Sequence, residues 1–138
     1  MEISNGFRVR VANGEVNFSS DVFKAIVMAE GFSFNPATHA LYADVIASEI
    51  GGGNGYTVGG ASLSGVAIAQ NNTDNRADVT WNTVSWTATG GDVGPCAGVI
   101  IYDDTLTGDP ILGYINFGGT YTVAQGGTAT VANIRVRL

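Results

Sequence analysis

The chain has 138 residues, of which 45% are hydrophobic, and a net charge of −6. This length fits one domain with a sizeable core, and the single cysteine excludes an internal disulfide or a multi-cysteine zinc site. The acidic balance argues against a nucleic-acid partner, and the lack of a long apolar segment argues against a membrane span. We therefore expect one domain over residues 1–138.

Short runs rich in β-branched and aromatic residues alternate with clusters of Gly, Asn, Asp and Pro. The dominant period is two, which predicts strands rather than helices. The predicted strands lie near residues 7–11, 22–29, 43–49, 64–70, 76–81, 84–88, 97–102, 111–117, 120–124 and 128–138. The clearest turns lie at residues 71–75, 90–95, 103–110, 118–119 and 125–127. This pattern predicts an all-β fold, an antiparallel β-sandwich of jelly-roll or similar kind.

Two segments leave the choice of element open. Residues 21–30 could form a short helix that ends at Gly31, but their almost continuous apolar run favours a strand. Residues 35–39 are typical of a turn. In residues 99–102 both faces are apolar, which predicts a central strand that is covered on both sides.

The two tryptophans have opposite parity within the segment from Thr80 to Trp86. One regular strand would send Trp81 and Trp86 to opposite faces of a sheet. Either an interruption at residues 82–83 resets the alternation, or one tryptophan lies on the outer face. We favour the reset.

A block of ten residues, 51–60, contains six glycines. It is too short for a linker between domains, and strand-like sequence flanks it. We expect an exposed loop that is long enough to contact a partner, with Asn54 and Tyr56 as the candidate contact residues.

No group of residues has the spacing of a catalytic site. His39 is the only histidine and lies in a predicted turn, which favours a hydrogen-bonded structural role over a catalytic base. Cys96 has no basic neighbour that would activate its thiol. Asp44 and Glu49 could supply the acid pair of a glycosidase, but no feature of the sequence marks them. We therefore expect a protein that is not an enzyme and has no cofactor.

Asp103, Asp104 and Asp109 surround a short loop. Clustered carboxylates can bind calcium, but their spacing differs from that of the twelve-residue calcium loop. A solvated hairpin loop is the favoured interpretation, and whether the loop binds a metal stays open.

The aromatic residues also allow two interpretations. They could form a platform for a sugar, although in a β-sandwich such residues belong more often to the core, which we favour. The residues concerned are Tyr56, Trp81, Trp86, Tyr102, Tyr114 and Tyr121.

Four of the six positive charges lie in two similar segments near the ends of the chain, Phe7–Val11 and Ile134–Leu138. As strands, these segments would place Arg8 and Arg10, and likewise Arg135 and Arg137, on one face. If the segments lay side by side, these four candidate interface residues would form a basic surface. Arginine pairs with carboxylates in bidentate geometry, which suits an interface. Charges that protect a solvated edge strand are the alternative, and both stay open.

A set of segments shares its sequence pattern with known proteins. They are Phe34–His39, Tyr42–Val45, Gly53–Gly60, Leu63–Val66, Arg76–Trp81, Val84–Trp86, Gly94–Pro95, Gly98–Asp104 and Gly113–Ile115. In these segments the chain resembles a family of small virion proteins of tailed bacteriophages, which are called decoration, cement or minor structural proteins. No catalytic residue comes with this resemblance.

The resemblance implies a capsid decoration (cement) protein that binds and stabilises the shell of the major capsid protein. We expect a homo-oligomer, with a trimer favoured, on the capsid surface of a virion assembled in the host cytoplasm. The N-terminal residues lack the profile of a signal peptide, in keeping with that expectation. The alternative is a tail or neck component with a receptor- or glycan-binding β-sandwich, which would need exposed aromatic residues.

Overall fold

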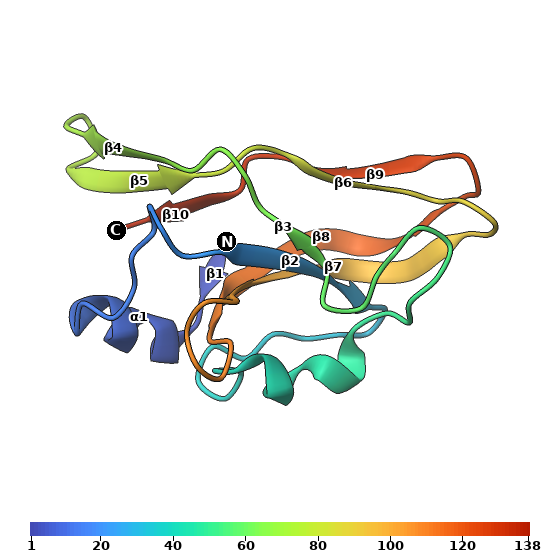
Figure 1. The fold of residues 1–138 in the computed structure, drawn as a ribbon, viewed down its shortest axis with the longest axis horizontal. Helices are drawn as coiled ribbons and strands as arrows, with labels where there is room; N and C mark the ends of the chain where they lie inside the picture. The colour runs from blue at the N-terminus through green and yellow to red at the C-terminus, as the bar shows by residue number, and fades with distance from the viewer.

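The computed structural model describes all residues 1–138 and has three layers (Figure 1). The middle layer is an antiparallel sheet with the order β1-β8-β7-β2-β3. Its strands are β1 (Glu2–Ile3), β2 (Phe23–Ala29), β3 (Ala61–Ser62), β7 (Val93–Asp103) and β8 (Ile111–Val123). The prediction of an all-β antiparallel sandwich is confirmed.

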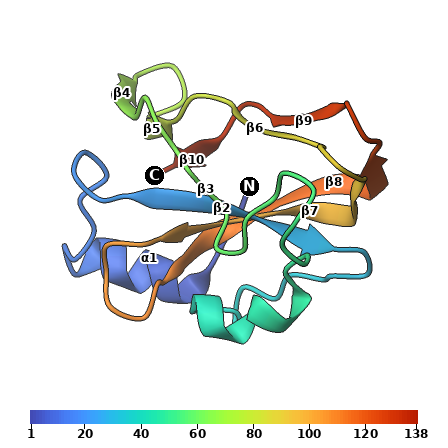
Figure 2. The same cartoon turned by 45° about the vertical axis from the view of Figure 1, so that its right-hand side comes forward.

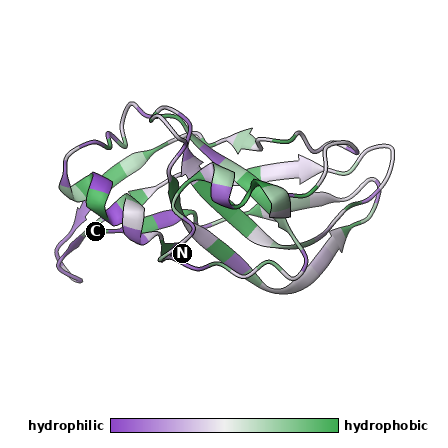
Figure 3. Ribbon diagram, turned by 90° about the horizontal axis from the view of Figure 1, so that it is seen from below, coloured by the Kyte–Doolittle hydropathy of each residue, from purple (hydrophilic) through white to green (hydrophobic).

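The upper layer contains two small sheets with the orders β10-β5-β4 and β6-β9. Their strands are β4 (Ala67–Asn71), β5 (Arg76–Thr80), β6 (Val84–Thr87), β9 (Thr128–Val131) and β10 (Arg135–Arg137). The lower layer holds helix α1 (Asn5–Ala12) and two short 3-10 helices, η1 (Tyr42–Asp44) and η2 (Ile46–Ser48). Hydrophobic residues concentrate in the strands behind these helices (Figure 3).

The middle sheet is covered on both faces, and a separate apolar cluster is buried against each face. In β2, Ala25 and Val27 belong to the cluster between the middle sheet and the upper layer, whereas Ile26 and Met28 belong to the cluster beneath the middle sheet. Successive strand residues point to opposite faces, so a strand buried on both sides must be apolar throughout. This explains the apolar run from Ala25 to Ala29 in β2. It also confirms that residues 99–102 lie in a central strand, because all four are buried within β7.

The two sheets of the upper layer share one long antiparallel ladder, in which the segment β5–β6 runs beside the segment β9–β10 and the pairing is interrupted in the middle. The Trp81 N–H donates to the carbonyl of Ile134 at 3.1 Å, between the pairs Thr80–Arg135 and Val84–Val131. The pairing register is therefore the same on both sides of the interruption, while the alternation of faces restarts. Trp81 and Trp86 both lie in the core between the sheets, so the predicted reset is confirmed.

Residues 7–11 were expected to form a strand, which is wrong, because they lie in helix α1. Phe7 and Val11 are four residues apart and therefore share one face of the helix. Phe7 is fully buried and Val11 packs against the same core, whereas Val9 is 59% exposed. An alternating segment of five residues satisfies both periods, so packing against the sandwich decides between them.

The strand expected at residues 43–49 is also wrong, since this segment forms η1 and η2. The carboxylate of Asp44 accepts hydrogen bonds from the N–H groups of Ala40 and Leu41 at 3.0 and 2.8 Å. This local contact stabilises a tight turn in place of an extended chain.

Three strand boundaries also differ from the prediction. β8 runs through residues 118–119, which were expected to form a turn; Gly118 has a φ of 77° there. β7 begins at Val93, inside the turn expected at residues 90–95. The strand expected at residues 128–138 is divided into β9 and β10 by the interruption described above.

Candidate docking surface at the arginine end

Helix α1 brings Arg8 to the end of the molecule where β10 lies. Ser4 occupies the N-cap position, and Gly14, with a φ of 73°, follows the last turn and allows the helix to stop. Arg8 lies beside Phe7 and Val11 on the helix surface, so it borders the face that packs against the core. Figures 1 and 2 both place α1 and β10 at the same side of the molecule.

Strand β10 presents its two arginines to solvent. Val136 is 1% exposed and points into the core, whereas Arg135 and Arg137 are exposed on the opposite face. β10 pairs with β5, so Arg135 lies opposite Thr80 and Arg137 opposite Asp78. The expectation that these two arginines share a face is met in this strand.

Two hollows lie beside β10 at this end of the molecule. The first, of about 240 Å³, has an apolar lining with Arg8 and Arg137 at its margin. Its apolar residues are Ile3, Phe7, Val11, Val136 and Leu138. The second, of about 310 Å³, lies between Met1, Asn133, Arg135 and Arg137. We call Arg8, Arg135, Arg137 and these two hollows the arginine end.

The arginines of this surface have no acidic partner in the chain. The ion pairs of the chain engage Arg10, Lys24 and Arg76. Arg8, Arg135 and Arg137 form none, so their charges are available to another molecule. The two arginine-containing segments do lie near each other, but as a helix beside a strand and not as paired strands.

Arg10 does not belong to the arginine end. Its side chain turns away to Glu15 and pairs with that carboxylate at 2.9 Å. Residues two apart on a helix point in different directions, so the shared face expected for Arg8 and Arg10 is wrong.

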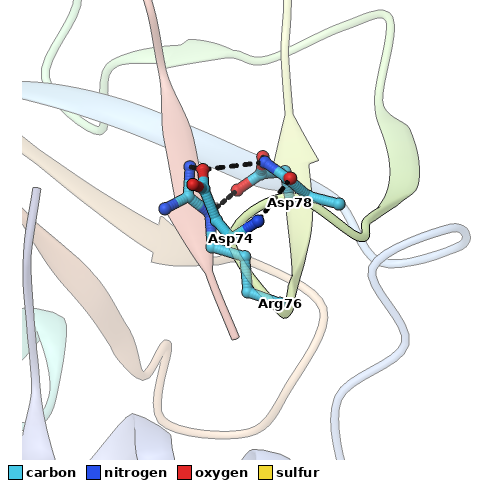
Figure 4. A network of polar contacts seen from close by, with 4 residues as sticks. Asp74, Arg76 and Asp78 are labelled. Carbon is cyan, nitrogen blue, oxygen red and sulfur yellow. Dashed lines mark hydrogen bonds and ion pairs between the residues drawn. The ribbon is translucent and has the colours of Figure 1, made fainter.

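A polar network on β5 shows how the chain neutralises a paired arginine. Arg76 lies between Asp74 and Asp78, at 2.9 and 2.8 Å (Figure 4). A hydrogen bond from Asn71, together with the charges of Arg76 and Arg135, holds the pKa of Asp78 below its usual value. Arg135 thus acts on this network only at long range, and its guanidinium remains unpaired.

The glycine-rich block 51–60 lies at the opposite end of the molecule (Figure 1). Tyr56 is 2% exposed, and its side chain packs into the core between the sheets. The expectation that Tyr56 contacts a partner is therefore wrong for its side chain. Asn54 faces the neighbouring turn, where its amide donates to the carbonyl of Asp92 at 2.9 Å.

Tyr56 is part of a cluster centred on Glu49. The two oxygens of Glu49 accept hydrogen bonds from the hydroxyl groups of Tyr42 and Tyr56, and the N–H of Gly59 also donates to Glu49. These contacts fasten the glycine-rich block to the body of the molecule, so the carboxylate of Glu49 has a structural role.

The other candidate chemical residues also take structural roles. Nδ1 of His39 accepts a hydrogen bond from the Asn35 N–H at 3.1 Å, which confirms the expectation of a hydrogen-bonded turn residue. Cys96 is buried, and its Sγ donates to the carbonyl of Tyr121. Burial raises the pKa of the Cys96 thiol, which disfavours the reactive thiolate.

The acidic loop after β7 does not gather its carboxylates around one point. Asp103 is fully buried, and its Oδ1 accepts hydrogen bonds from the N–H groups of Thr105 and Leu106. These two hydrogen bonds stabilise the turn between β7 and β8. Asp104 pairs with Lys24 instead. No group of three or more acidic, histidine or cysteine side chains lies together in the chain.

Most of the aromatic residues belong to the interior, as favoured. Trp81, Trp86, Tyr56, Tyr102 and Tyr114 are all buried. Tyr121 is 55% exposed and is the exception. A flat aromatic platform for a sugar would need several exposed rings, and these residues do not provide one.

Sequence reasoning missed the apolar hollow beside the arginines. Its lining combines Ile3, the helix residues Phe7 and Val11, and Val136 with Leu138 from the other end of the chain. The spacing of Phe7 and Val11, with Gly14 as a helix stop, was the signal available in the sequence.

Comparison with known proteins identifies no relative of this chain. No helix of the structure has the length and apolar character that a bilayer crossing needs. No family model, no curated protein and no solved structure matches the chain.

Proposed function

We propose that the chain is a structural protein of a bacteriophage virion, a capsid decoration (cement) protein that binds the major capsid protein through the arginine end. The assignment to a virion rests on the resemblance of the sequence segments to virion proteins. The arginine end supports docking as its mode of action. One observation carries this step: Arg8 and Arg137, which have no acidic partner, border an apolar hollow on a body of net charge −6. A third unpaired arginine, Arg135, lines the second hollow together with Arg137.

The composition of the arginine end matches that of a protein interface. Interfaces combine an apolar centre with a polar rim, and arginine is enriched in them. Here the hollow of about 240 Å³ supplies the apolar centre, and Arg8 and Arg137 lie at its margin. A matching partner would insert an apolar side chain and present carboxylates to the two guanidinium groups.

The charge distribution also predicts how the partner is approached. A partner surface that presents carboxylates would repel the exposed acidic residues of the body and attract the arginine end. This asymmetry orients the chain during encounter and speeds association at low ionic strength. The same argument predicts that binding weakens as salt is added.

The alternative of a glycan-binding tail or neck component lacks a supporting observation. It requires exposed aromatic residues, and Trp81, Trp86 and Tyr56 are buried. We therefore retain the decoration protein as the proposal.

A binding assay with purified heads that lack this chain tests the proposal. The double variant Arg135→Gln/Arg137→Gln should weaken binding by about 2–5 kcal/mol if both charges are buried at the interface. Arg10→Gln is the matched control, because Arg10 is already paired with Glu15. Equal binding by the double variant and the native chain would refute docking through the arginine end.

A further inference from the structure

Strand β4 forms an unprotected edge of the upper layer. It is hydrogen-bonded to β5 on one side only, and Figure 1 shows it at a corner of the molecule. Every residue from Ser64 to Gln70 is exposed. Residues 61–73 contain neither a charged residue nor a proline. Edge strands are ordinarily protected by such residues or by a covering segment, because a free edge pairs readily with another strand.

The apolar face that lines the core continues into β4 without a cover. Val136 and Ile68 both lie opposite Val79 in the pairing register, so all three side chains share the inner face. Val79 and Val136 are 0% and 1% exposed, whereas Ile68 is 53% exposed. Val66, the residue immediately before β4, is exposed as well. The apolar face thus extends one strand beyond the elements that bury it.

The backbone of β4 offers free hydrogen-bonding groups at regular positions. Ala77 and Leu138 exchange two hydrogen bonds, of 3.0 and 2.9 Å, so the polar groups of Ala77 point towards β10. In an antiparallel sheet the direction of the backbone polar groups alternates from one residue to the next. The N–H and C=O groups of Asp78 therefore point towards β4, where Asp78 pairs with Ala69. It follows that the backbone N–H and C=O groups of Ile68 point away from β5, as do those of Val66 and Gln70.

The opposite edge of the same sheet is protected. By the same alternation, the free backbone N–H and C=O groups of β10 belong to Arg135 and Arg137, whose side chains are charged. Approach of β10 from a second copy to that edge would bring arginine side chains together. Of the two edges of this sheet, only β4 accepts a strand without that cost.

We propose that β4 pairs with β4 of a second copy of this chain, antiparallel and centred on Ile68, to form one continuous sheet across two copies. In this register Ile68 opposes its own equivalent and Val66 opposes Gln70, so every outward N–H and C=O group of the three residues finds a partner. Opposed residues share a face, so the two Ile68 side chains pack together. This contact goes beyond the docking of the arginine end and does not depend on it.

The absence of charge along the β4 edge allows a second copy to be the partner. Copies of a chain with net charge −6 repel one another. The uncharged segment 61–73 is where two copies approach with the least repulsion, and the register opposes no like charges. A contact of a surface with itself closes as a dimer, so the trimer expected from the resemblance would have to use another surface.

Sedimentation velocity over a concentration series of the purified chain tests the proposal. We expect a monomer–dimer equilibrium that Ile68→Lys weakens at least about tenfold, because two lysines would then oppose each other. Val58→Lys is the matched control: Val58 is also 53% exposed but lies in the glycine-rich block, so this variant should dimerise as the native chain does. Added salt should strengthen the dimer, because it screens the repulsion between two acidic copies.

Amide hydrogen exchange on the native chain gives a second readout that needs no variant. The amides of Val66, Ile68 and Gln70 should exchange more slowly as the concentration rises. Those of Ala67 and Ala69, bonded to β5, should be protected at every concentration. A chain that stays monomeric with unchanged exchange would overturn the proposal. So would a dimer that Ile68→Lys leaves intact, or protection of these amides only after another protein is added.

Discussion

The Tyr56 hydroxyl group donates a hydrogen bond to Oε1 of Glu49 at 2.5 Å and accepts one from the Val27 N–H at 3.0 Å. This bridge joins the glycine-rich block to β2 in the middle sheet. It explains why a segment with six glycines is held in one conformation.

Tyr56→Phe should destabilise the fold, because it leaves the Val27 N–H and one oxygen of Glu49 without this partner. A buried polar group that loses its hydrogen bond costs about 1–3 kcal/mol. The change in the free energy of unfolding can be measured by urea titration. Tyr121→Phe is the control, since Tyr121 is exposed and should change stability little. An equal effect of both substitutions would contradict the bridging role.

The stability of the fold should decrease at alkaline pH. Burial, assisted by nearby carboxylates, raises the pKa of Tyr42, Tyr56 and Tyr102. The unfolded chain loses these protons near pH 10, while the folded chain keeps them. The tyrosine contribution is therefore fully present below about pH 10 and is lost as the pH rises towards the folded pKa values. Urea midpoints measured from pH 8 to pH 11 should fall, and a flat profile would contradict these assignments.

Asp103→Asn should stabilise the protein at neutral pH. Burial raises the pKa of Asp103, with a further contribution from nearby Asp21, and its Oδ2 has no hydrogen-bond partner. Asparagine keeps an oxygen that can accept the N–H groups of Thr105 and Leu106 but carries no charge.

The gain from this substitution should shrink as the pH falls. The contribution of the Asp103 side chain to the stability of the native protein is greatest below the pKa of about 3.9 that it has in the unfolded chain. This contribution is lost as the pH rises through the raised pKa of the folded state. Unfolding midpoints of both proteins at pH 7 and pH 5 measure the difference, with Asp109→Asn as the control for net charge. A constant difference, or a loss at pH 7, would refute the prediction.

Tryptophan emission should report a buried environment. Trp81 and Trp86 are 8% and 6% exposed. We expect weak quenching of the folded chain by acrylamide and strong quenching of the chain unfolded in urea. Strong quenching of the folded chain would contradict the placement of both indoles in the core and would revive the glycan-binding alternative.

Much of the sandwich could be predicted from the sequence. The apolar run in β2 and the residues Val99–Tyr102 identify strands covered on both faces, because only a buried strand tolerates apolar residues at every position. The opposite parity of Trp81 and Trp86 correctly located the interruption of the long ladder in the upper layer. In each case the pattern was long enough, or the residues large enough, to determine which side is buried.

The misassigned elements are short segments that satisfy two patterns. Residues 7–11 fit a strand with period two, but Phe7 and Val11 also fit one face of a helix. Asp44 bonds to backbone N–H groups only a few residues away, and propensity alone does not reveal that choice. The docking surface was predicted in part, because the arginines were visible in the sequence while the apolar hollow is formed by distant segments.

The copy number of the chain in purified particles tests the proposed role most directly. Densitometry of the separated virion proteins gives the ratio of this chain to the major capsid protein. A decoration protein predicts a copy number comparable with that of the shell protein. A copy number limited to a single ring at the neck or tail, or the absence of the chain from the particle, would contradict the proposal.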